Sequence, residues 1–175
     1  AVHSAAIGGP SKLITRKGAL PMAGFDQVMK VNLYGALHLM RAAVPAMMQN
    51  MPNEDGERGV IVNVSSGAAW DGQVGQIAYA ASKAAIVGMT TPLMRELAEH
   101  GIRVMAVAPG AFDTPIYDGA PPALKQSLID HSLFPKRMGK PDEFAMLVEE
   151  IVRNPMHNGR TYRLDAGMAM PPSQR

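Results

Sequence analysis

The sequence has 175 residues, of which 47% are hydrophobic and 18% are charged, and this composition is typical of one folded domain with its own core. Its 17 basic and 15 acidic residues give a net charge of +2, which is too balanced to favour a nucleic-acid partner. The chain contains no cysteine, so disulfides and thiolate chemistry are excluded. No apolar run reaches the roughly 18 residues that a membrane helix requires, so no membrane association is expected.

The N-terminal part of the chain predicts a strand, a loop and a long helix. Residues 2–7 are expected to form a short strand, which a Gly-Gly-Pro sequence ends. Residues 11–21 are polar and indicate a loop. Apolar residues then recur at helical spacing, which predicts a helix over residues 24–49 that Pro45 kinks near its end.

The rest of the chain alternates between buried strands and helices. Residues 60–64 are a continuous β-branched run, which is typical of a parallel strand buried on both faces. An Ala-rich segment predicts a helix over residues 78–100, and a second buried strand follows at residues 102–107. The remaining expected elements are a partly helical, proline-interrupted lobe at 115–135, a helix at 141–153 and a strand at 161–164.

This order of elements predicts an α/β fold, in which a parallel sheet carries helices on both faces. The continuous apolar strands support the prediction because a parallel sheet is covered on both sides. No repeat, low-complexity tract or linker divides the chain, so residues 1–175 are expected to form a single domain.

Tyr79 and Lys83 are candidates for proton-transfer chemistry. Residues four apart share one face of a helix, so their side chains are expected to meet. A lysine ammonium beside a phenol favours the phenolate, so we expect Lys83 to lower the pKa of Tyr79 toward neutral pH. Taken alone the pair is weak evidence, because such pairs are common on helix surfaces.

Ser65 and Ser66 strengthen this hypothesis, since they directly follow the strand at residues 60–64. Ligands of open α/β sheets bind at the carboxyl ends of the strands. The segment between Ser66 and Tyr79 can loop back, which would bring the serine hydroxyl to the phenol, where it could polarise a carbonyl group. The alternative is that the two serines only cap a turn or a helix.

Several motifs in this order resemble the short-chain dehydrogenase/reductase family. They are Ser66 after a strand, the Tyr79–Lys83 pair, Pro109-Gly110, Asp113-Thr114-Pro115 and Leu164-Asp165-Ala166-Gly167. The similarity covers residues 20–170, and the segment around Tyr79 most resembles the type II 3-hydroxyacyl-CoA dehydrogenases. The resemblance implies a Rossmann-type doubly wound parallel sheet that is truncated at its N-terminus.

The resemblance also implies roles for individual residues. Tyr79 would be the general acid/base, and Lys83 would lower its pKa and hold the nicotinamide ribose. Ser66 would bind and polarise the substrate carbonyl. Asn32 would support a proton-relay water near the lysine, with a helix kink or a surface amide as the alternatives. The positions implied to contact the cofactor are Tyr79, Lys83, Pro109, Gly110, Phe112 and Thr114.

Two residues of the loop after Ser66 have open interpretations. Gln76 would contact the acyl substrate according to the resemblance, or it is a solvated loop amide. Trp70 is expected to pack against its neighbours, and the alternative is a wall of the substrate site. Pro109-Gly110 could likewise be only a turn.

The implied reaction transfers a hydride between a nicotinamide cofactor and a secondary alcohol or ketone. NAD is the expected cofactor, with NADP as the alternative, and a 3-hydroxyacyl-CoA is the expected substrate class. Family members form homotetramers in which the helices matching residues 24–49 and 78–100 pair across subunits. The five histidines match no metal spacing, so no metal is expected. The expected location is cytoplasmic, or the mitochondrial matrix if a targeting segment precedes Ala1.

The departures from the family pattern lie at the N-terminus. The family's first three strands and its glycine-rich loop, which holds a pyrophosphate at a helix N-terminus, are expected to be absent. His3 stands where the family's Asn-Asn-Ala-Gly motif has an amide. These departures leave a second hypothesis, in which the chain is a non-catalytic fragment or a degraded paralogue that serves as a subunit-interaction module.

Overall fold

The computed structural model describes residues 1–172, and its main feature is a four-stranded parallel sheet. The strands have the spatial order β1-β4-β5-β6, and each neighbouring pair is parallel. The predicted α/β class and the parallel sheet are therefore confirmed. The strand bounds are β1, Val2–His3; β4, Gly59–Val64; β5, Ile102–Pro109; and β6, Thr161–Leu164.

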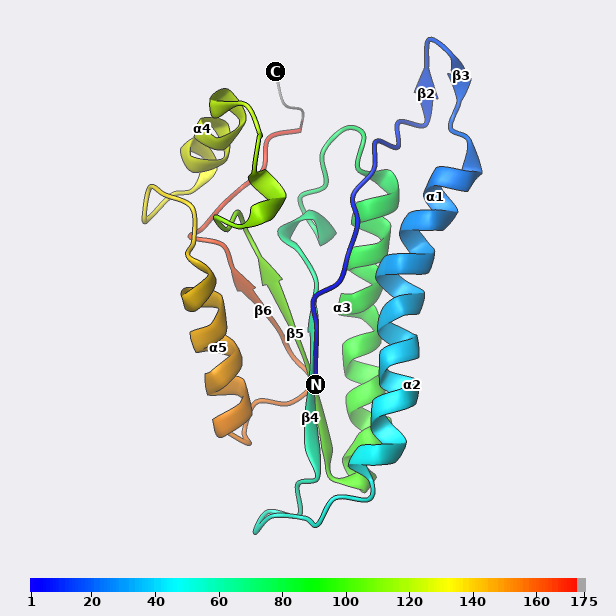
Figure 1. Ribbon diagram of the computed structural model, residues 1–175, viewed down its shortest axis with the longest axis vertical. Coiled ribbons are helices and arrows are strands. Elements are labelled where there is room, and N and C mark those ends of the chain that lie inside the picture. Colours follow the sequence, from blue (N-terminus) through cyan, green and yellow to red (C-terminus); the bar gives the residue numbers. More distant parts are fainter. Residues whose placement is uncertain (173–175) are drawn as a thin grey trace.

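Helices cover both faces of this sheet, as Figure 1 shows. Helices α1, α2 and α3 lie on one face, α5 lies on the other, and α4 lies beyond the carboxyl ends of the strands. This is the arrangement expected of a doubly wound sheet. The helix bounds are α1, Met22–Met29; α2, Gly35–Met47; α3, Ile77–Leu97; α4, Pro122–His131; and α5, Pro141–Arg153.

The core explains why β4 and β5 are continuously apolar. Successive side chains of a strand point to opposite faces of the sheet. Ile61 packs with Ile86 of α3 on one face, whereas Val62 packs with Ile151 of α5 on the other. Because both faces are covered, the strands have no solvent-facing positions at which polar residues would alternate with apolar ones.

The helix predicted for residues 24–49 extends from Met22 to Met47 in three segments. Between α1 and α2, residues 30–34 form a π-helical segment whose hydrogen bonds skip one extra residue. The irregularity therefore lies at this segment rather than at Pro45, through which α2 continues. The apolar pattern of the sequence cannot tell whether the helix is irregular at residues 30–34 or at Pro45. The extra residue of a π-helical segment is fixed by contacts with other elements, which the pattern does not contain.

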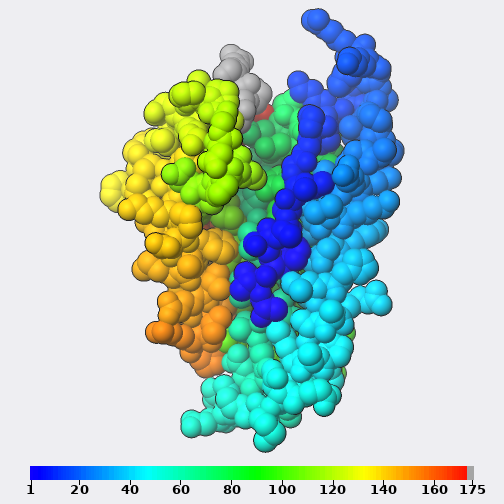
Figure 2. Space-filling model, viewed as in Figure 1, coloured from blue at the N-terminus to red at the C-terminus, as the bar shows by residue number. Residues whose placement is uncertain are grey.

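The N-terminal segment forms a shorter strand than predicted. Only Val2 and His3 pair with β4, at the edge of the sheet. The chain then leaves the sheet, and both backbone groups of Ile7 bind the side chain of Asn32. Figure 2 shows this segment in dark blue, lying on the surface between the α1–α2 helices and the lobe that contains α4 and α5. The strand prediction for residues 2–7 was therefore too long.

A small hairpin occupies part of the segment that was predicted to be a loop, residues 11–21. Its strands, β2 at Ile14–Thr15 and β3 at Gly18–Ala19, pair antiparallel. Gly18 has a φ of 110°, a conformation that this tight turn requires and that glycine adopts without steric cost. Two strands of two residues each are too short to leave an alternating pattern in the sequence.

The C-terminal predictions are confirmed. Helix α5 and strand β6 have the predicted bounds, and helix α3 ends in a 3₁₀ turn closed by Gly101. Gly101 has a φ of 68°, and a side chain here would collide with the backbone of Gly56. The start and stop signals of these elements are local, which is why the sequence alone locates them.

Candidate active site

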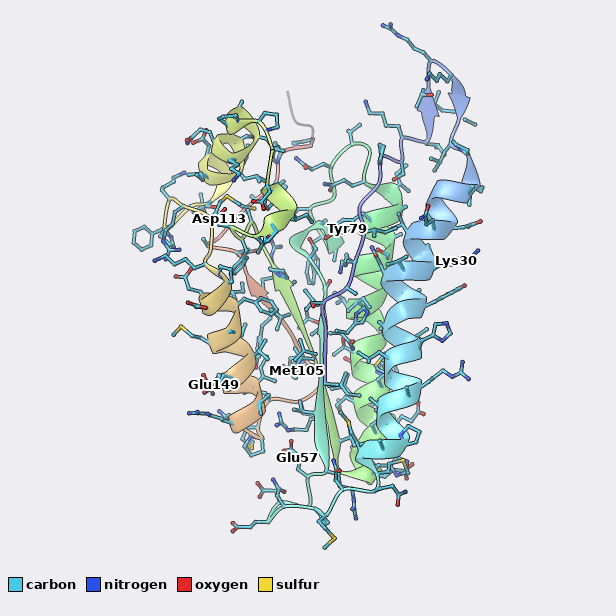
Figure 3. The ribbon with its side chains drawn as sticks, in the orientation of Figure 1. Lys30, Glu57, Tyr79, Met105, Asp113 and Glu149 are labelled. Carbon is cyan, nitrogen blue, oxygen red and sulfur yellow. The ribbon has the colours of Figure 1, made fainter. Side chains whose placement is uncertain are left out.

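A cavity of about 820 Å³ lies at the carboxyl ends of β4, β5 and β6. Figure 3 shows Tyr79 near this end of the sheet, on the α3 side. The cavity brings together segments that are far apart in the sequence. The predicted site residues that line it are Ser66, Gln76, Tyr79, Lys83, Pro109, Gly110, Phe112 and Thr114. Asn32 is the one predicted site residue that does not line it.

The two serines after β4 have different partners. The Ser65 hydroxyl donates to the Lys83 carbonyl oxygen at 2.8 Å, which ties the end of β4 to α3. The Ser66 hydroxyl accepts a hydrogen bond from the Ala68 N–H at 3.2 Å and caps the short 3₁₀ turn at residues 67–69. Ser66 also lines the cavity, so its capping role and a role toward a ligand are compatible.

Tyr79 lies in the first turn of α3, with its phenol in the cavity wall. Burial raises the pKa of the phenol above its usual value, and its hydrogen bond with Ser66 opposes this shift. The expectation that Lys83 brings this pKa toward neutral was wrong for the structure described here. Desolvation disfavours the phenolate more strongly than its neighbours favour it.

Lys83 is a buried cation, with 2% of its surface exposed. Its Nζ donates to the Val64 carbonyl oxygen at 2.8 Å and lies 5.7 Å from the centroid of the Tyr79 ring. Burial lowers the pKa of Lys83 to about 8, so the ammonium, although still mostly charged at neutral pH, loses its proton far more readily than a solvated lysine. The pair thus meets on one helix face as predicted, but burial acts against the charged form of both groups.

Asn32 lies in the π-helical segment and has 1% of its surface exposed. Its Oδ1 accepts from the Ile7 N–H at 2.8 Å, and its Nδ2 donates to the Ile7 carbonyl oxygen and to Ser82 Oγ, both at 3.0 Å. Ser82 in turn donates to the Tyr79 carbonyl oxygen at 2.7 Å. The surface-amide alternative for Asn32 is therefore wrong, because the side chain is buried in an irregular part of the helix. Its role toward a water near Lys83 stays a prediction.

Gln76 is held by the loop that precedes α3. Its Oε1 accepts from the Gln73 N–H at 3.0 Å, and Gln73 Nε2 donates to the Pro171 carbonyl oxygen at 3.1 Å. These bonds link the loop to the C-terminal segment, which covers part of the cavity. Gln76 is therefore an ordered wall residue, and its contact with an acyl group stays a prediction.

The wall of the cavity opposite Tyr79 was not predicted from the sequence. Tyr117 and Leu128 come from the proline-interrupted lobe, and Met168 and Met170 come from the segment after β6. The two methionines could have been found, because they follow a predicted strand at its carboxyl end. The lobe has no regular period, so the sequence contained no signal for Tyr117.

A phenol, an ammonium one helical turn away and a hydroxyl at the end of the adjacent strand are groups that can move a proton to or from a carbonyl oxygen. Their position at the carboxyl edge of a parallel sheet agrees with the predicted resemblance to the short-chain dehydrogenases and reductases. The chain belongs to this family, whose model, described as short chain dehydrogenase, matches residues 2–124.

Individual relatives agree with this assignment. The chain is 45% identical to a human protein named 3-hydroxyacyl-CoA dehydrogenase type-2, over 98% of this chain and 67% of that protein. A Drosophila melanogaster protein of the same name is 46% identical over 85% of this chain and 58% of that protein. The crystal structure of a Mycobacterium avium protein with that description has a TM-score of 0.93 at 35% identity, over 98% of this chain and 67% of that chain. The chain thus spans between 58% and 67% of the length of these relatives.

Two further findings concern residues 1–172. No helix in this range combines the length and the apolar character that a membrane span requires. The same residues contain no cluster of three or more His, Cys, Asp or Glu side chains arranged to hold a metal ion.

Proposed function

We propose that the chain carries the catalytic part of an oxidoreductase that transfers a hydride between a nicotinamide cofactor and a secondary alcohol or ketone. The observation that carries the proposal is that Ser66, Tyr79 and Lys83 line one cavity. A 3-hydroxyacyl-CoA is the proposed substrate class, because the relatives at 45% and 46% identity bear that name. The relatives, which are named as dehydrogenases, give no support to the non-catalytic alternative.

NAD is the proposed cofactor, with NADP as the alternative. When bound, its oxidised form would accept the hydride of an alcohol, and its reduced form would donate a hydride to a ketone. The fit of its nicotinamide end is supported by the donors of Lys83, whose ammonium has three N–H groups and donates one hydrogen bond within the described residues. The other two are available to ribose hydroxyls. Pro109, Gly110, Phe112 and Thr114 would contact the nicotinamide. The 175 residues contain no glycine-rich loop for the pyrophosphate.

The proposed roles follow from the protonation states. Because the pKa of Tyr79 is raised, its phenol is protonated at neutral pH, which suits it to donate a proton to a ketone oxygen during reduction. The Ser66 hydroxyl would bind the same oxygen and stabilise the charge that develops there. Lys83 would hold the ribose and, when charged, stabilise the phenolate that remains.

The wall opposite Tyr79 supports an acyl substrate. Leu128, Met168 and Met170 are apolar, and methionine adapts its shape to flexible chains. Assembly into homotetramers through α2 and α3 and a cytoplasmic or mitochondrial location stay predictions.

The test is Tyr79→Phe in the native protein, assayed for reduction of a 3-ketoacyl-CoA by NADH and by NADPH. Loss of the phenolic proton should lower kcat by roughly a hundredfold to ten-thousandfold, with an unchanged circular dichroism spectrum. Tyr34→Phe, at an exposed position of the π-helical segment, is the matched control. A Tyr79→Phe variant with kcat within about twofold of wild type would remove the phenol from the mechanism.

A further inference from the structure

Arg163 of β6 links segments that form the cavity, although no motif singles it out. Its Nη2 donates to Asp71 Oδ2 at 2.7 Å and to the Met168 carbonyl oxygen at 3.1 Å. Its Nε donates to Asp165 Oδ2 at 2.6 Å. The guanidinium carbon also lies 5.4 Å from the centroid of the Trp70 ring, within the range of a cation–π contact.

These partners belong to the loops that follow two different strands. Trp70 and Asp71 directly follow the 3₁₀ turn that Ser66 caps, in the loop between β4 and α3. Asp165 and Met168 lie in the segment after β6, and the Met168 side chain lines the cavity. Arg163 therefore joins the loop that carries the serine to the segment that closes the opposite wall.

The turn after β5 is included through Asp165. A Cβ atom on Gly110 would come within 2.8 Å of the Asp165 Cβ, so this turn packs directly against the aspartate. The Gly110 N–H also donates to the Leu164 carbonyl oxygen at 2.9 Å. The loops after β4, β5 and β6 thus meet around one guanidinium group.

The geometry of the group goes beyond an ordinary surface ion pair. The Asp165 side chain is only 10% exposed, and its Oδ1 also accepts the Gly167 N–H at 3.1 Å. Isolated exposed ion pairs contribute little, but a planar guanidinium that serves two carboxylates, a carbonyl and an aromatic face constrains their relative positions. A lysine ammonium could not make all four contacts, because it is a compact charge without a planar fork.

We propose that Arg163 is a positioning residue that holds the Ser66 loop against the Tyr79 phenol. The proposal rests on the proposed function, because it assigns the position of Ser66 to the same reaction. Release of the loop would move the Ser66 hydroxyl away from the phenol. Since this hydroxyl opposes the upward shift of the Tyr79 pKa, its withdrawal would raise that pKa further.

Trp70 provides a direct readout, because it is the only tryptophan in the chain. In Arg163→Met the indole loses its stacking partner, so its fluorescence should become more accessible to acrylamide and its emission should shift to longer wavelength. Arg163→Lys should fall between Arg163→Met and wild type. Arg153→Met is the matched control, because Arg153 pairs with Glu149 at an exposed position on α5.

Kinetics in the native protein test the consequence for Ser66. Arg163→Met should lower kcat by about tenfold to a hundredfold, as expected of a misplaced group, with the KM for the cofactor within about twofold of wild type. The pH at which the phenol ionises should move upward. Asp71→Asn should change Trp70 quenching and kcat in the same direction as Arg163→Met. If Arg163→Met does not fold, Asp71→Asn tests the positioning role in its place.

The outcomes separate the two proposals. Unchanged Trp70 quenching and unchanged kcat in a folded Arg163→Met variant would overturn the positioning role. Altered quenching with unchanged kcat and pH profile would also overturn it, because the ion pairs would then be structural only. A native protein without any dehydrogenase activity would instead overturn the proposed function, since the quenching measurement does not depend on turnover.

Discussion

Lys83 and Arg103 are both buried cations, and they lie at opposite ends of the same sheet. Lys83 is 2% exposed and lies at the carboxyl end of β4, whereas Arg103 is 6% exposed and lies near the start of β5. Figure 3 shows the two ends through their labelled neighbours, Tyr79 above and Glu57 below. Both cations are buried, but their surroundings differ.

Arg103 has its charge and its donors satisfied. It pairs with Glu57 through Nε and Nη2, each at 3.0 Å. It also donates to the carbonyl oxygens of Ile151 at 2.8 Å, Val152 at 3.1 Å and His157 at 2.9 Å. The carbonyls of Ile151 and Val152 belong to the C-terminal turn of α5, where the helix dipole favours a positive charge.

Lys83 has no such partner. Within the described residues it forms no ion pair, and its Nζ donates only to the Val64 carbonyl oxygen. The lowered pKa follows from this burial without a counter-charge. The end of the sheet at Arg103 is therefore arranged for stability, whereas the end at Lys83 keeps an uncompensated charge that is available for a ligand.

The largest expected effect on stability is that of Arg103→Met. Removal of the guanidinium leaves the Glu57 carboxylate largely buried and several carbonyls without donors, so the free energy of unfolding should fall by about 3–5 kcal/mol. Urea unfolding measures this. Arg153→Met removes an exposed pair and should change the free energy of unfolding by less than about 0.5 kcal/mol. If the free energy of unfolding fell by as little in Arg103→Met, the Arg103 end of the sheet would not be arranged for stability.

Lys83→Met should have the opposite sign. The pKa of Lys83 is about 8 in the fold and 10.5 in the unfolded chain, so at neutral pH the fold carries a charge that it disfavours. Removal of that charge should raise the free energy of unfolding by about 1–3 kcal/mol, after loss of one hydrogen bond.

The pH dependence of Lys83→Met sharpens this prediction. Between pH 8 and 10.5 the folded protein releases the proton that the unfolded chain keeps, so wild-type stability should gain on the variant as pH rises. Above 10.5 the variant should have no advantage from the charge. Urea unfolding across this range measures the difference, with exposed Lys17→Met as control. A Lys83→Met variant that is destabilised at neutral pH would contradict the claim that the charge of Lys83 destabilises the fold.

The smallest effect is expected at His3, which faces the same end of the sheet as Lys83. Burial lowers the pKa of His3, and the Lys83 charge lowers it further. His3 Nδ1 and Asn63 Oδ1, on paired positions of β1 and β4, are buried atoms without a partner in the structure described. Within residues 1–172, no carboxylate forms an ion pair with the His3 imidazole.

His3→Asn should therefore flatten the acid side of the stability curve. The unfolded histidine gains a proton below its pKa of 6.5 before the folded one does, so wild-type stability falls as pH drops through this range. The variant should lack this loss of stability between about pH 7 and pH 5. Urea unfolding at both values measures it, and His38→Asn on the exposed side of α2 is the control. Equal acid sensitivity of His3→Asn and wild type would show that His3 does not cause the loss of stability at acid pH.

Particular residues show how far the sequence could be interpreted. The strands at 60–64 and 102–107 were predictable because burial on both faces leaves no polar alternation. Ser66, Tyr79 and Lys83 were found because their spacing places them after a strand and on one helix face, and the cavity brings them together. The hairpin at 14–19 was not found, and the strand predicted at residues 2–7 was too long, because both depend on a few contacts rather than on a period.

The sequence by itself determined the parallel α/β class, the main helices and the candidate residues for proton transfer, because periodicity, caps and motif spacing are local properties. Only the tertiary structure decided the pKa direction of Tyr79, since burial depends on segments far along the chain. It also decided the partners of Asn32, the wall formed by Tyr117 and Met168, and the contacts of Arg163 with Asp71, 92 residues away. Such contacts leave no mark in a single sequence, because they join residues whose spacing follows no period.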